Sequence, residues 1–207
     1  MNSTSHPAFR KPTGVTINGR TSTITNAFVN SIIPIIPPTI EQVDEALSIL
    51  GMNGDNFSCA YCGDAMTEWD HLNPLVRDKK PTGFVSEIHN LVPSCGKCNQ
   101  SKGNKEWREW IVGDARLSPK TKGVQDLDAR IGRLEEYERR GIPRKHNFEE
   151  YIGPNDWAIH WENLTRVWEL LKESQELAST IKRSIENRLA ENQHISGFDV
   201  RQRSATR

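Results

Sequence analysis

The stretch that decides the fold is residues 59–110, CAYCGDAMTEWDHLNPLVRDKKPTGFVSEIHNLVPSCGKCNQSKGNKEWREW, which holds every cysteine of the chain. The cysteines form two Cys-x-x-Cys pairs, Cys59 with Cys62 and Cys95 with Cys98. Two such pairs supply four thiolates, which fit the tetrahedral coordination of one zinc ion and leave no position open for a substrate. We therefore predict a structural Zn²⁺ site that joins two distant parts of the chain. A redox dithiol and reduced, unligated cysteines are the alternatives.

The composition of the whole chain fits a globular protein outside the membrane. Of the 207 residues, 35% are hydrophobic and 26% are charged, which allows one domain with extensions or two small domains. The most apolar stretch, residues 32–40, contains three prolines and is far shorter than the roughly 20 residues of a membrane-spanning helix. The N-terminus is polar where a signal peptide would begin its apolar run. We expect a cytoplasmic protein without a membrane partner, where paired thiols are more often metal ligands than disulfides.

Polar residues typical of catalytic sites lie between and beside the cysteine pairs. Asp70 and His71 are adjacent, and His89 and Asn90 precede a Leu-Val-Pro run. The last cysteine of the second pair begins a Cys-Asn-x-x-Lys-Gly pattern, in which the Asn is Asn99. These features together resemble the HNH, or ββα-metal, endonucleases, in the variant whose core is supported by a four-cysteine zinc. The resemblance covers about residues 57–110, roughly a quarter of the chain, and extends over many independent positions.

The resemblance implies a role for four of these residues. In the family, the Asp-His pair ends the first strand of a β-hairpin, the second strand carries a middle Asn, and a short helix carries the last residue of the motif. Asp70 would be a metal ligand, His71 the general base, Asn90 the residue that fixes the loop and orients the histidine, and Asn99 the second metal ligand. Asn99 stands where the family name has His. Because amide and carboxylate oxygens suit hard cations, this favours Mg²⁺ or Mn²⁺ as the catalytic ion.

Elementary chemistry agrees with these roles. Phosphodiester hydrolysis requires a water that loses its proton near neutral pH, and histidine, with an ordinary pKa of about 6.5, is the side chain suited to accept that proton. Other interpretations remain for the same residues. Asp70 could cap a helix or pair with an arginine, and His89 could be the base, although we interpret it as structural or as facing a phosphate. Glu68 alternates with Asp70 along the predicted strand and shares its face.

Basic residues gather after the second cysteine pair. The formal net charge of the chain is zero, which excludes binding of nucleic acid through bulk positive charge. Residues 97–108 contain four basic residues and a single acidic residue, Glu106. We predict that the four basic residues contact nucleic acid: Lys97, Lys102, Lys105 and Arg108. A solvated surface without a ligand is the alternative.

The flanking segments are predicted to be helical arms, which makes the fold class α+β and mainly α-helical. Thr39 and Gln42 have the spacing of a capping box, apolar residues recur with helical periodicity over 124–140, and a long helix begins near Asn155. The expected divisions are a flexible arm at 1–23, a helical segment at 24–56, the nuclease core with its zinc at 57–112, a helical region at 113–195 and a basic tail at 196–207.

The function that these predictions favour is a site-specific, restriction-type endonuclease that cuts double-stranded DNA. A phage or mobile-element homing nuclease and a non-catalytic zinc-stabilised module that binds nucleic acid are the alternatives. One HNH site cuts one strand, so a double-strand break requires two sites or two visits. A homodimer formed through the C-terminal helices would supply two sites, and packing of the long helix within the chain is the alternative.

Overall fold

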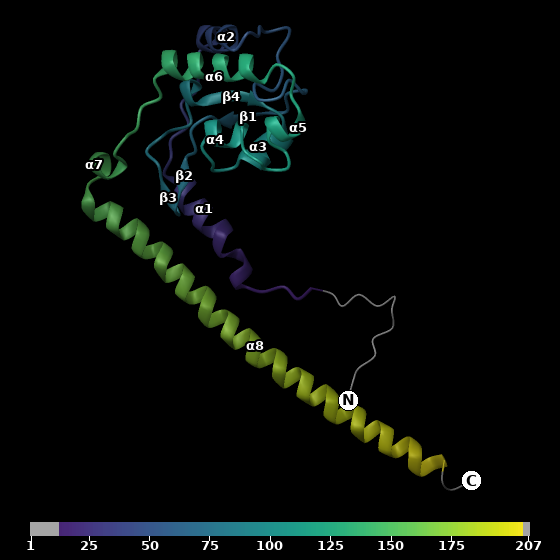
Figure 1. Cartoon of the computed structure of the whole chain (residues 1–207). Helices are drawn as coiled ribbons and strands as arrows, with labels where there is room; N and C mark the ends of the chain where they lie inside the picture. The colour runs from purple at the N-terminus through teal and green to yellow at the C-terminus, as the bar shows by residue number, and fades with distance from the viewer. Residues whose placement is uncertain (1–12, 205–207) are drawn as a thin grey trace. The chain divides into compact units, whose positions relative to one another are not determined.

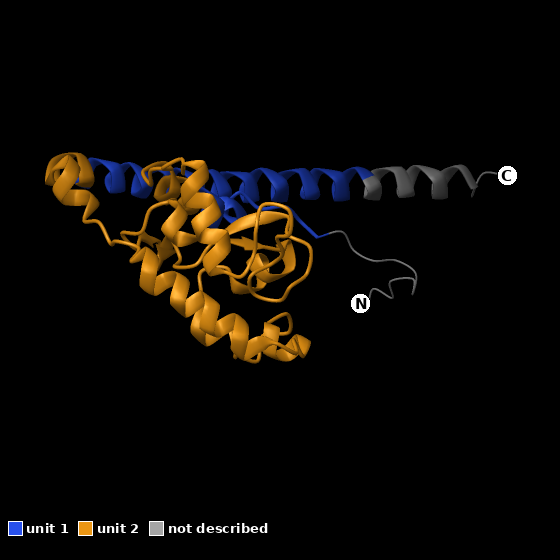
Figure 2. Ribbon diagram, turned by 90° about the horizontal axis from the view of Figure 1, so that it is seen from above, with its two compact units in different colours: residues 1–24, 158–207 blue, residues 25–157 orange. Residues whose placement is uncertain are grey.

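A computed structural model describes residues 13–204 of the chain, and the side chains of residues 13–192. The described residues divide into two compact units, drawn in two colours in Figure 2. Residues 13–24 and 158–204 belong to one unit, and residues 25–157 belong to the other. The second unit therefore contains the whole stretch of cysteines and predicted site residues.

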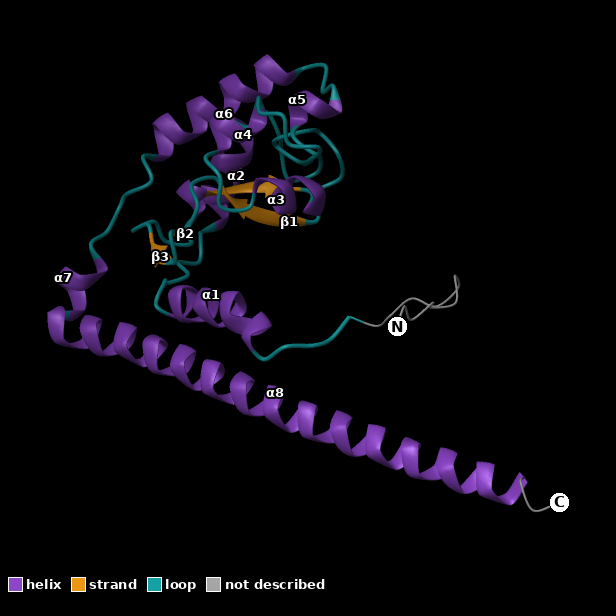
Figure 3. Ribbon diagram, turned by 60° about the horizontal axis from the view of Figure 1, so that its bottom comes forward, coloured by secondary structure: helices purple, strands orange, loops and turns teal. Residues whose placement is uncertain are grey.

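A two-stranded antiparallel sheet and a short helix form the centre of the second unit. Strand β1 (Glu68–His71) pairs with β4 (Leu91–Ser94), and the register places Asp70 opposite Val92. Helix α3 (Gly96–Lys102) follows β4 directly. The order strand, strand, helix confirms the predicted α+β class with a small ββα core (Figure 3).

A second, smaller hairpin lies between the two central strands in the chain. Strand β2 (Val76–Arg77) pairs with β3 (Lys80–Pro81), and the turn residues Asp78 and Lys79 have φ angles of 51° and 63°. Two consecutive positive φ angles are the requirement of a type I′ turn, whose twist matches that of the strands it joins.

Helices account for most of the described chain, as predicted. Figure 1 labels the α-helices along the chain. The remaining helical elements are the 3-10 turns η1 (Asn18–Arg20) and η2 (Ile88–Asn90) and the helices α1 (Thr21–Ser31), α2 (Ile40–Ile49), α4 (Trp107–Ile111), α5 (Pro119–Lys122), α6 (Leu127–Gly141), α7 (Phe148–Ile152) and α8 (Pro154–Ser204).

Local sequence signals explain where several of these helices begin and end. The predicted capping box is confirmed at α2, where the Thr39 hydroxyl accepts from the Gln42 N–H and the Gln42 side chain accepts from the Thr39 N–H. Helix α6 ends at Gly141, and Ile142 follows with a positive φ of 44°. Pro143 then prevents the helix from continuing.

Helices α2 and α6 pack around η2 and the central sheet. Tyr137, on α6, is buried, and its hydroxyl donates to the backbone carbonyls of Ile88 and Leu91, the latter at 2.8 Å. Trp107 and Trp110 are buried in the same core. One hydrophobic core therefore holds the sheet, the cysteines and helix α6 together.

Two predicted boundaries differ from the structure. Helical structure begins at Asn18 and α1 at Thr21, inside the arm predicted over 1–23, of which residues 1–12 lie outside the described chain. Helix α8 continues to Ser204, through most of the tail predicted from Ser196. The last part of α8 consists mostly of polar residues, which is also the composition of a disordered tail. Composition alone therefore placed the end of the helix too early.

Helix α8 dominates the first unit. The Ile17 N–H donates to the Gln175 side chain at 2.7 Å, which ties the N-terminal segment of this unit to the helix. Farther along, Ile181, Ile185 and Leu189 lie four residues apart and are each at least half exposed. In the described part of the chain, no helix combines the length and the apolar character needed to cross a bilayer.

Candidate functional site

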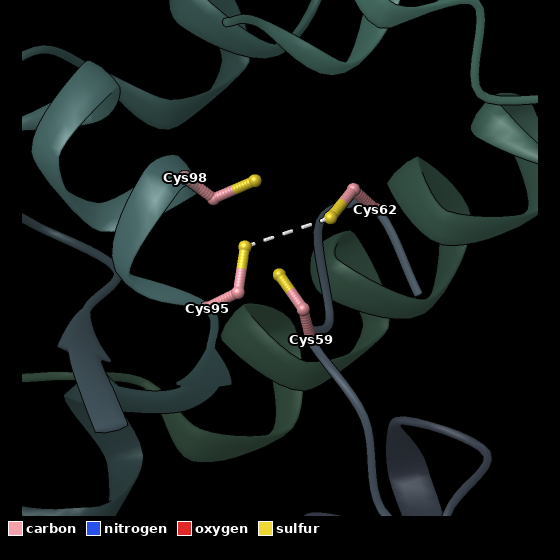
Figure 4. A group of neighbouring side chains, drawn as sticks. All are labelled: Cys59, Cys62, Cys95 and Cys98. Atoms are coloured by element: carbon pink, nitrogen blue, oxygen red, sulfur yellow. Dashed lines mark hydrogen bonds between the residues drawn. The ribbon is translucent and has the colours of Figure 1, made fainter. Parts of the chain in front are cut away.

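The four cysteines converge on one point. Cys59 and Cys62 lie on a tight turn before β1, Cys95 is the N-cap of α3, and Cys98 lies within α3. Their sulfur atoms are all within 4.8 Å of one another, and those of Cys62 and Cys95 are 3.8 Å apart (Figure 4). A tetrahedral site with zinc–sulfur bonds of about 2.3 Å places its sulfurs about 3.8 Å apart. The cluster is therefore compatible with one zinc ion.

The proton balance of the cluster also favours a cation. Hydrogen bonds from Cys62 and then Cys98 lower the pKa of the Cys59 thiol to about 3, whereas the pKa of Cys98 is raised because hydrogen bonds to Cys59 and then Cys62 favour its protonated form. Without a cation, the group shares protons among its sulfurs, since adjacent thiolates repel one another. A bound divalent ion would stabilise all four thiolates together.

Asp70 is buried beside the cysteine cluster and has two hydrogen-bond donors on one oxygen. Its Oδ2 accepts from the Tyr61 hydroxyl at 2.7 Å and lies 3.2 Å from the Lys102 ammonium. Burial raises the pKa of the Asp70 carboxyl, and the charge of Lys102 and the hydrogen bond from Tyr61 oppose that rise. Tyr61 lies between the two cysteines of the first pair, so the predicted metal ligand is held by the same turn that would hold the zinc.

Lys102 has a different position from the one predicted. Its side chain is only 1% exposed, and its ammonium donates to the His71 carbonyl at 2.6 Å as well as contacting Asp70. The structure contradicts the prediction that Lys102 meets a phosphate, because the last turn of α3 packs against β1 and directs this ammonium into the core. Burial lowers its pKa, and the Asp70 carboxylate opposes that effect.

The ring of His71 is half buried at the end of β1. Its Nε2 lies 2.9 Å from the Ser86 hydroxyl. Burial, followed by the nearby positive charge of Lys102, lowers the pKa of the His71 imidazole to about 4. At neutral pH the ring is therefore uncharged, which is the state in which a histidine can accept a proton.

Asn90 is buried and closes the loop that follows β1. Its side-chain oxygen accepts from the Asn73 N–H at 2.8 Å, and its amide donates to the Asn73 carbonyl at 3.0 Å. Asn90 lies in η2, one residue before the strand on which we expected it. The hydrogen bond to the His71 ring comes from Ser86 and not from Asn90, so any effect of Asn90 on that ring acts through the loop.

Asn99 lies on α3, three residues before Lys102, and therefore on the same face of the helix. This face is the one that reaches β1, because Lys102 bonds to both residues of the Asp70–His71 pair. The side chain of Asn99 is half buried, and the described residues show no hydrogen bond between it and Asp70. Its proposed role as a metal ligand therefore remains a prediction.

His89 lies in a different place from His71. It contacts Gly141, where an added Cβ would be 3.2 Å from its ring nitrogen Nδ1, and it borders a small cleft between α2 and α6. The other predicted base is therefore on the side of η2 that packs against α6. This position agrees with the structural interpretation of His89.

The remaining basic residues predicted to contact nucleic acid are exposed on and after α3. The Lys105 ammonium donates to the Ser101 carbonyl at 2.8 Å. Arg108 lies 2.5 Å from a Glu138 carboxylate oxygen and stacks over the Trp107 ring at 4.4 Å. Contact of Lys97, Lys105 and Arg108 with nucleic acid remains a prediction, and Arg108 would have to exchange a carboxylate partner for a phosphate.

Two site residues were not found from the sequence. Ser86 belongs to the loop after β3, and Tyr61 occupies one of the two positions between the cysteines that the Cys-x-x-Cys pattern leaves unspecified, so neither residue forms part of the motif. Both act through side-chain hydroxyls that meet distant residues in the folded chain. A motif search has no signal for such contacts.

The central sheet, the following helix, the four-cysteine cluster and the Asp70–His71 pair together define a ββα-metal arrangement. Residues 59–105 match the family model described as HNH endonuclease. These residues therefore form an HNH endonuclease domain, which confirms the family resemblance.

One curated relative is the CRISPR-associated endonuclease Cas9 of Corynebacterium diphtheriae. It is 41% identical to this chain over 59 residues, which are 27% of this chain and 5% of that protein. The chain thus corresponds to a small part of the relative's length, and the similarity concerns about the length of one domain. No solved structure matches the chain.

Proposed function

We propose that this protein is a metal-dependent HNH endonuclease that hydrolyses phosphodiester bonds in DNA. The observation that carries the proposal is the pairing on β1 of a buried, hydrogen-bonded carboxylate, Asp70, with an uncharged imidazole, His71. A module that only binds nucleic acid has no need to keep this pair together with Asn99. The match to the HNH family adds support.

The donor set fits a hard divalent cation. Tyr61 and Lys102 both contact Oδ2 of Asp70, and neither of these side chains bonds to the other carboxylate oxygen. Together with the Asn99 amide oxygen, that oxygen would hold Mg²⁺ or Mn²⁺, which prefer such ligands. When bound, the ion would supply positive charge to the scissile phosphate and to the leaving 3′-oxygen.

His71 would accept the proton of the attacking water. Its uncharged ring has a lone pair on one nitrogen, which is the group that this role requires. The separate four-cysteine cluster would hold Zn²⁺ as a structural ion, since an all-thiolate shell leaves no position for a substrate. We therefore assign the two metals to different tasks.

The direct test is a plasmid cleavage assay with purified protein. We expect nicking or linearisation of supercoiled plasmid with Mg²⁺ or Mn²⁺, and no cleavage when EDTA removes these ions. Absence of cleavage under every metal condition, from protein with a full zinc content, would favour the alternative of a non-catalytic module that binds nucleic acid. Sequencing the DNA ends would report the specificity and the stagger of the cuts.

We further propose site-specific, restriction-type cleavage of double-stranded DNA, with target choice supplied by the flanking arms. A homing nuclease of a phage or mobile element is the alternative within the class, and the length of the recognised site separates the two. A catalogue of cut ends would show a short repeated sequence for a restriction-type enzyme. A single long sequence would instead indicate a homing nuclease.

Because one HNH site cuts one strand, we propose that cleavage of both strands is carried out by a homodimer formed through α8. Ile181, Ile185 and Leu189 present an apolar stripe on one face of this helix, and a second copy of the same stripe would cover it. We expect a dimer mass by analytical ultracentrifugation and a shift to monomer when Ile185 is changed to Lys. A monomer mass for the wild-type protein would exclude this arrangement.

A further inference from the structure

We propose that Ser86 is a positioning residue for the His71 ring, and that the segment Pro34–Ile36, which lies before the HNH domain, holds Ser86 in place. The proposal rests on the proposed function, since it concerns the base of that reaction. It assigns to the flanking chain a task inside the catalytic site, in addition to the choice of target.

The first step is the contact between Ser86 and the ring. The Ser86 hydroxyl lies 2.9 Å from Nε2 of His71, and the described residues offer no hydrogen bond to the other ring nitrogen, Nδ1. When the hydroxyl accepts from an Nε2–H group, the lone pair of the imidazole lies on Nδ1. In the proposed arrangement the Ser86 hydroxyl accepts this hydrogen bond, and Nδ1 is then the nitrogen that can take the proton of a water.

The second step is the anchoring of Ser86 by residues outside the family match. The Ser86 N–H donates to the Pro34 carbonyl at 3.1 Å, and the Ile36 N–H donates to the Ser86 carbonyl at 2.8 Å. These two hydrogen bonds form a parallel bridge between Ile35 and Ser86. Both backbone groups of Ser86 are thus fixed by a segment that precedes the matched residues 59–105.

Two further contacts hold the loop that carries Ser86. The His146 N–H donates to the Gly83 carbonyl at 2.8 Å, and the Asn90 amide donates to the Val85 carbonyl at 3.4 Å. Gly83 is buried and has a φ of 94°, and an added Cβ would lie 2.7 Å from the His146 carbonyl. The loop is therefore held from the N-terminal side, the C-terminal side and the core.

These contacts explain how one hydroxyl can orient a ring at the end of a short strand. A serine on a free loop would lose its hydrogen bond to His71 through loop motion, because a surface loop samples many conformations. Three separate attachments reduce that freedom before the substrate arrives. The orientation of the base is thus pre-organised by the parts of the chain around the nuclease motif.

The test compares Ser86→Ala with Ser86→Thr in the full chain. We expect Ser86→Ala to lower kcat for plasmid nicking by about 10- to 100-fold, the usual loss when a partner that orients a site residue is removed, with an unchanged KM for DNA. Ser86→Thr keeps a hydroxyl and should restore most of the rate. Wild-type kcat in Ser86→Ala, or equal losses in both variants, would overturn the proposal.

A spectroscopic measurement separates this proposal from the proposed function. Long-range ¹H–¹⁵N correlation spectra report the tautomer of each histidine, and His71→Gln identifies the His71 signals by their loss. We expect one tautomer, with the proton on Nε2, in the wild type and a mixture in Ser86→Ala. If the wild type fails to cleave DNA, the proposed function fails, whereas an unchanged His71 tautomer in Ser86→Ala overturns the role of Ser86.

The anchoring step has its own matched pair of variants. Ile36→Pro removes the N–H that donates to Ser86, and Ile36→Ala shortens the same half-exposed side chain but keeps that N–H. We expect Ile36→Pro to reproduce the kcat loss and the tautomer mixture of Ser86→Ala, and Ile36→Ala to resemble the wild type. Wild-type kcat and tautomer in Ile36→Pro would overturn the role of the segment.

Discussion

The cysteine cluster and the Asp70–His71 pair lie side by side but depend on different physics. The spacing of the four sulfurs fits one ion that would bind all of them. Asp70 and His71 instead depend on individual hydrogen bonds from Tyr61, Lys102 and Ser86. Loss of the ion should therefore affect the whole domain, whereas loss of one hydrogen bond should affect one side chain.

Tyr61 connects the two regions. Its backbone belongs to the turn between the first two cysteines, and its hydroxyl contacts Asp70. The buried ring also packs edge-on against Trp110 with centroids 5.1 Å apart. We therefore expect the effect of removal to decrease from the ion at the cysteines, through the proposed general base, to the hydroxyl of Tyr61.

Removal of the cysteine-bound ion should have the largest effect. We expect Cys98→Ser, or treatment with a strong zinc chelator, to unfold the domain, because structural zinc contributes a binding free energy on the order of 10 kcal/mol. Zinc content by elemental analysis and the near-ultraviolet circular dichroism of the buried tryptophans report the change. Loss of zinc without loss of that tryptophan signal would show that the cluster does not support the core.

Removal of the proposed base should abolish cleavage and leave the fold intact. We expect His71→Ala to reduce the cleavage rate by about 10²- to 10⁴-fold, the usual contribution of general base catalysis. Zinc content and Tm should stay near the wild type. His89→Ala is the matched control and should cleave DNA normally, and the reverse pattern of activities would transfer the role of base to His89.

The same contrast explains which features could be predicted from the sequence. The spacing of the cysteines predicted their convergence, since two Cys-x-x-Cys pairs are typical of one zinc site, and Thr39 with Gln42 predicted a helix start because a capping box is local. The partners of Asp70 and His71 depend on loops and helices far apart in the chain. Neither hydrophobic periodicity nor a motif specifies where such a hydroxyl will point.

Lys102 illustrates the same limit for charge patterns. It lies among exposed basic residues in the sequence, and its burial follows only from the packing of α3 on β1. A helix of seven residues has too little periodicity to reveal which lysine faces inward. The predicted DNA-contact set therefore included one residue whose charge stabilises the site from within.

Loss of the Lys102 charge should destabilise the protein more than loss of an exposed lysine. We expect Lys102→Met to lower the free energy of unfolding by about 3–5 kcal/mol, because it leaves the buried Asp70 carboxylate without its counter-charge. Urea denaturation measures this change. Lys97→Met, on the exposed part of the same helix, is the control and should have nearly wild-type stability, and equal stability of the two variants would contradict the buried ion pair.

The smallest predicted effect tests the link between the two regions. We expect Tyr61→Phe to lower the free energy of unfolding by about 1.5–3 kcal/mol, the range for a hydrogen bond to a charged group, and to weaken Mg²⁺-dependent cleavage. Tyr137→Phe is the matched control, because its hydroxyl donates to the backbone carbonyls of Ile88 and Leu91 and not to Asp70. It should lower the free energy of unfolding by about 0.5–1.5 kcal/mol and leave the Mg²⁺ concentration for half-maximal cleavage unchanged.

If both variants shift that concentration equally, the Tyr61 hydroxyl does not position Asp70, and the cysteine turn and the catalytic pair are only neighbours. If Tyr61→Phe alone raises it, the turn that holds the zinc also sets the geometry of the proposed catalytic metal site.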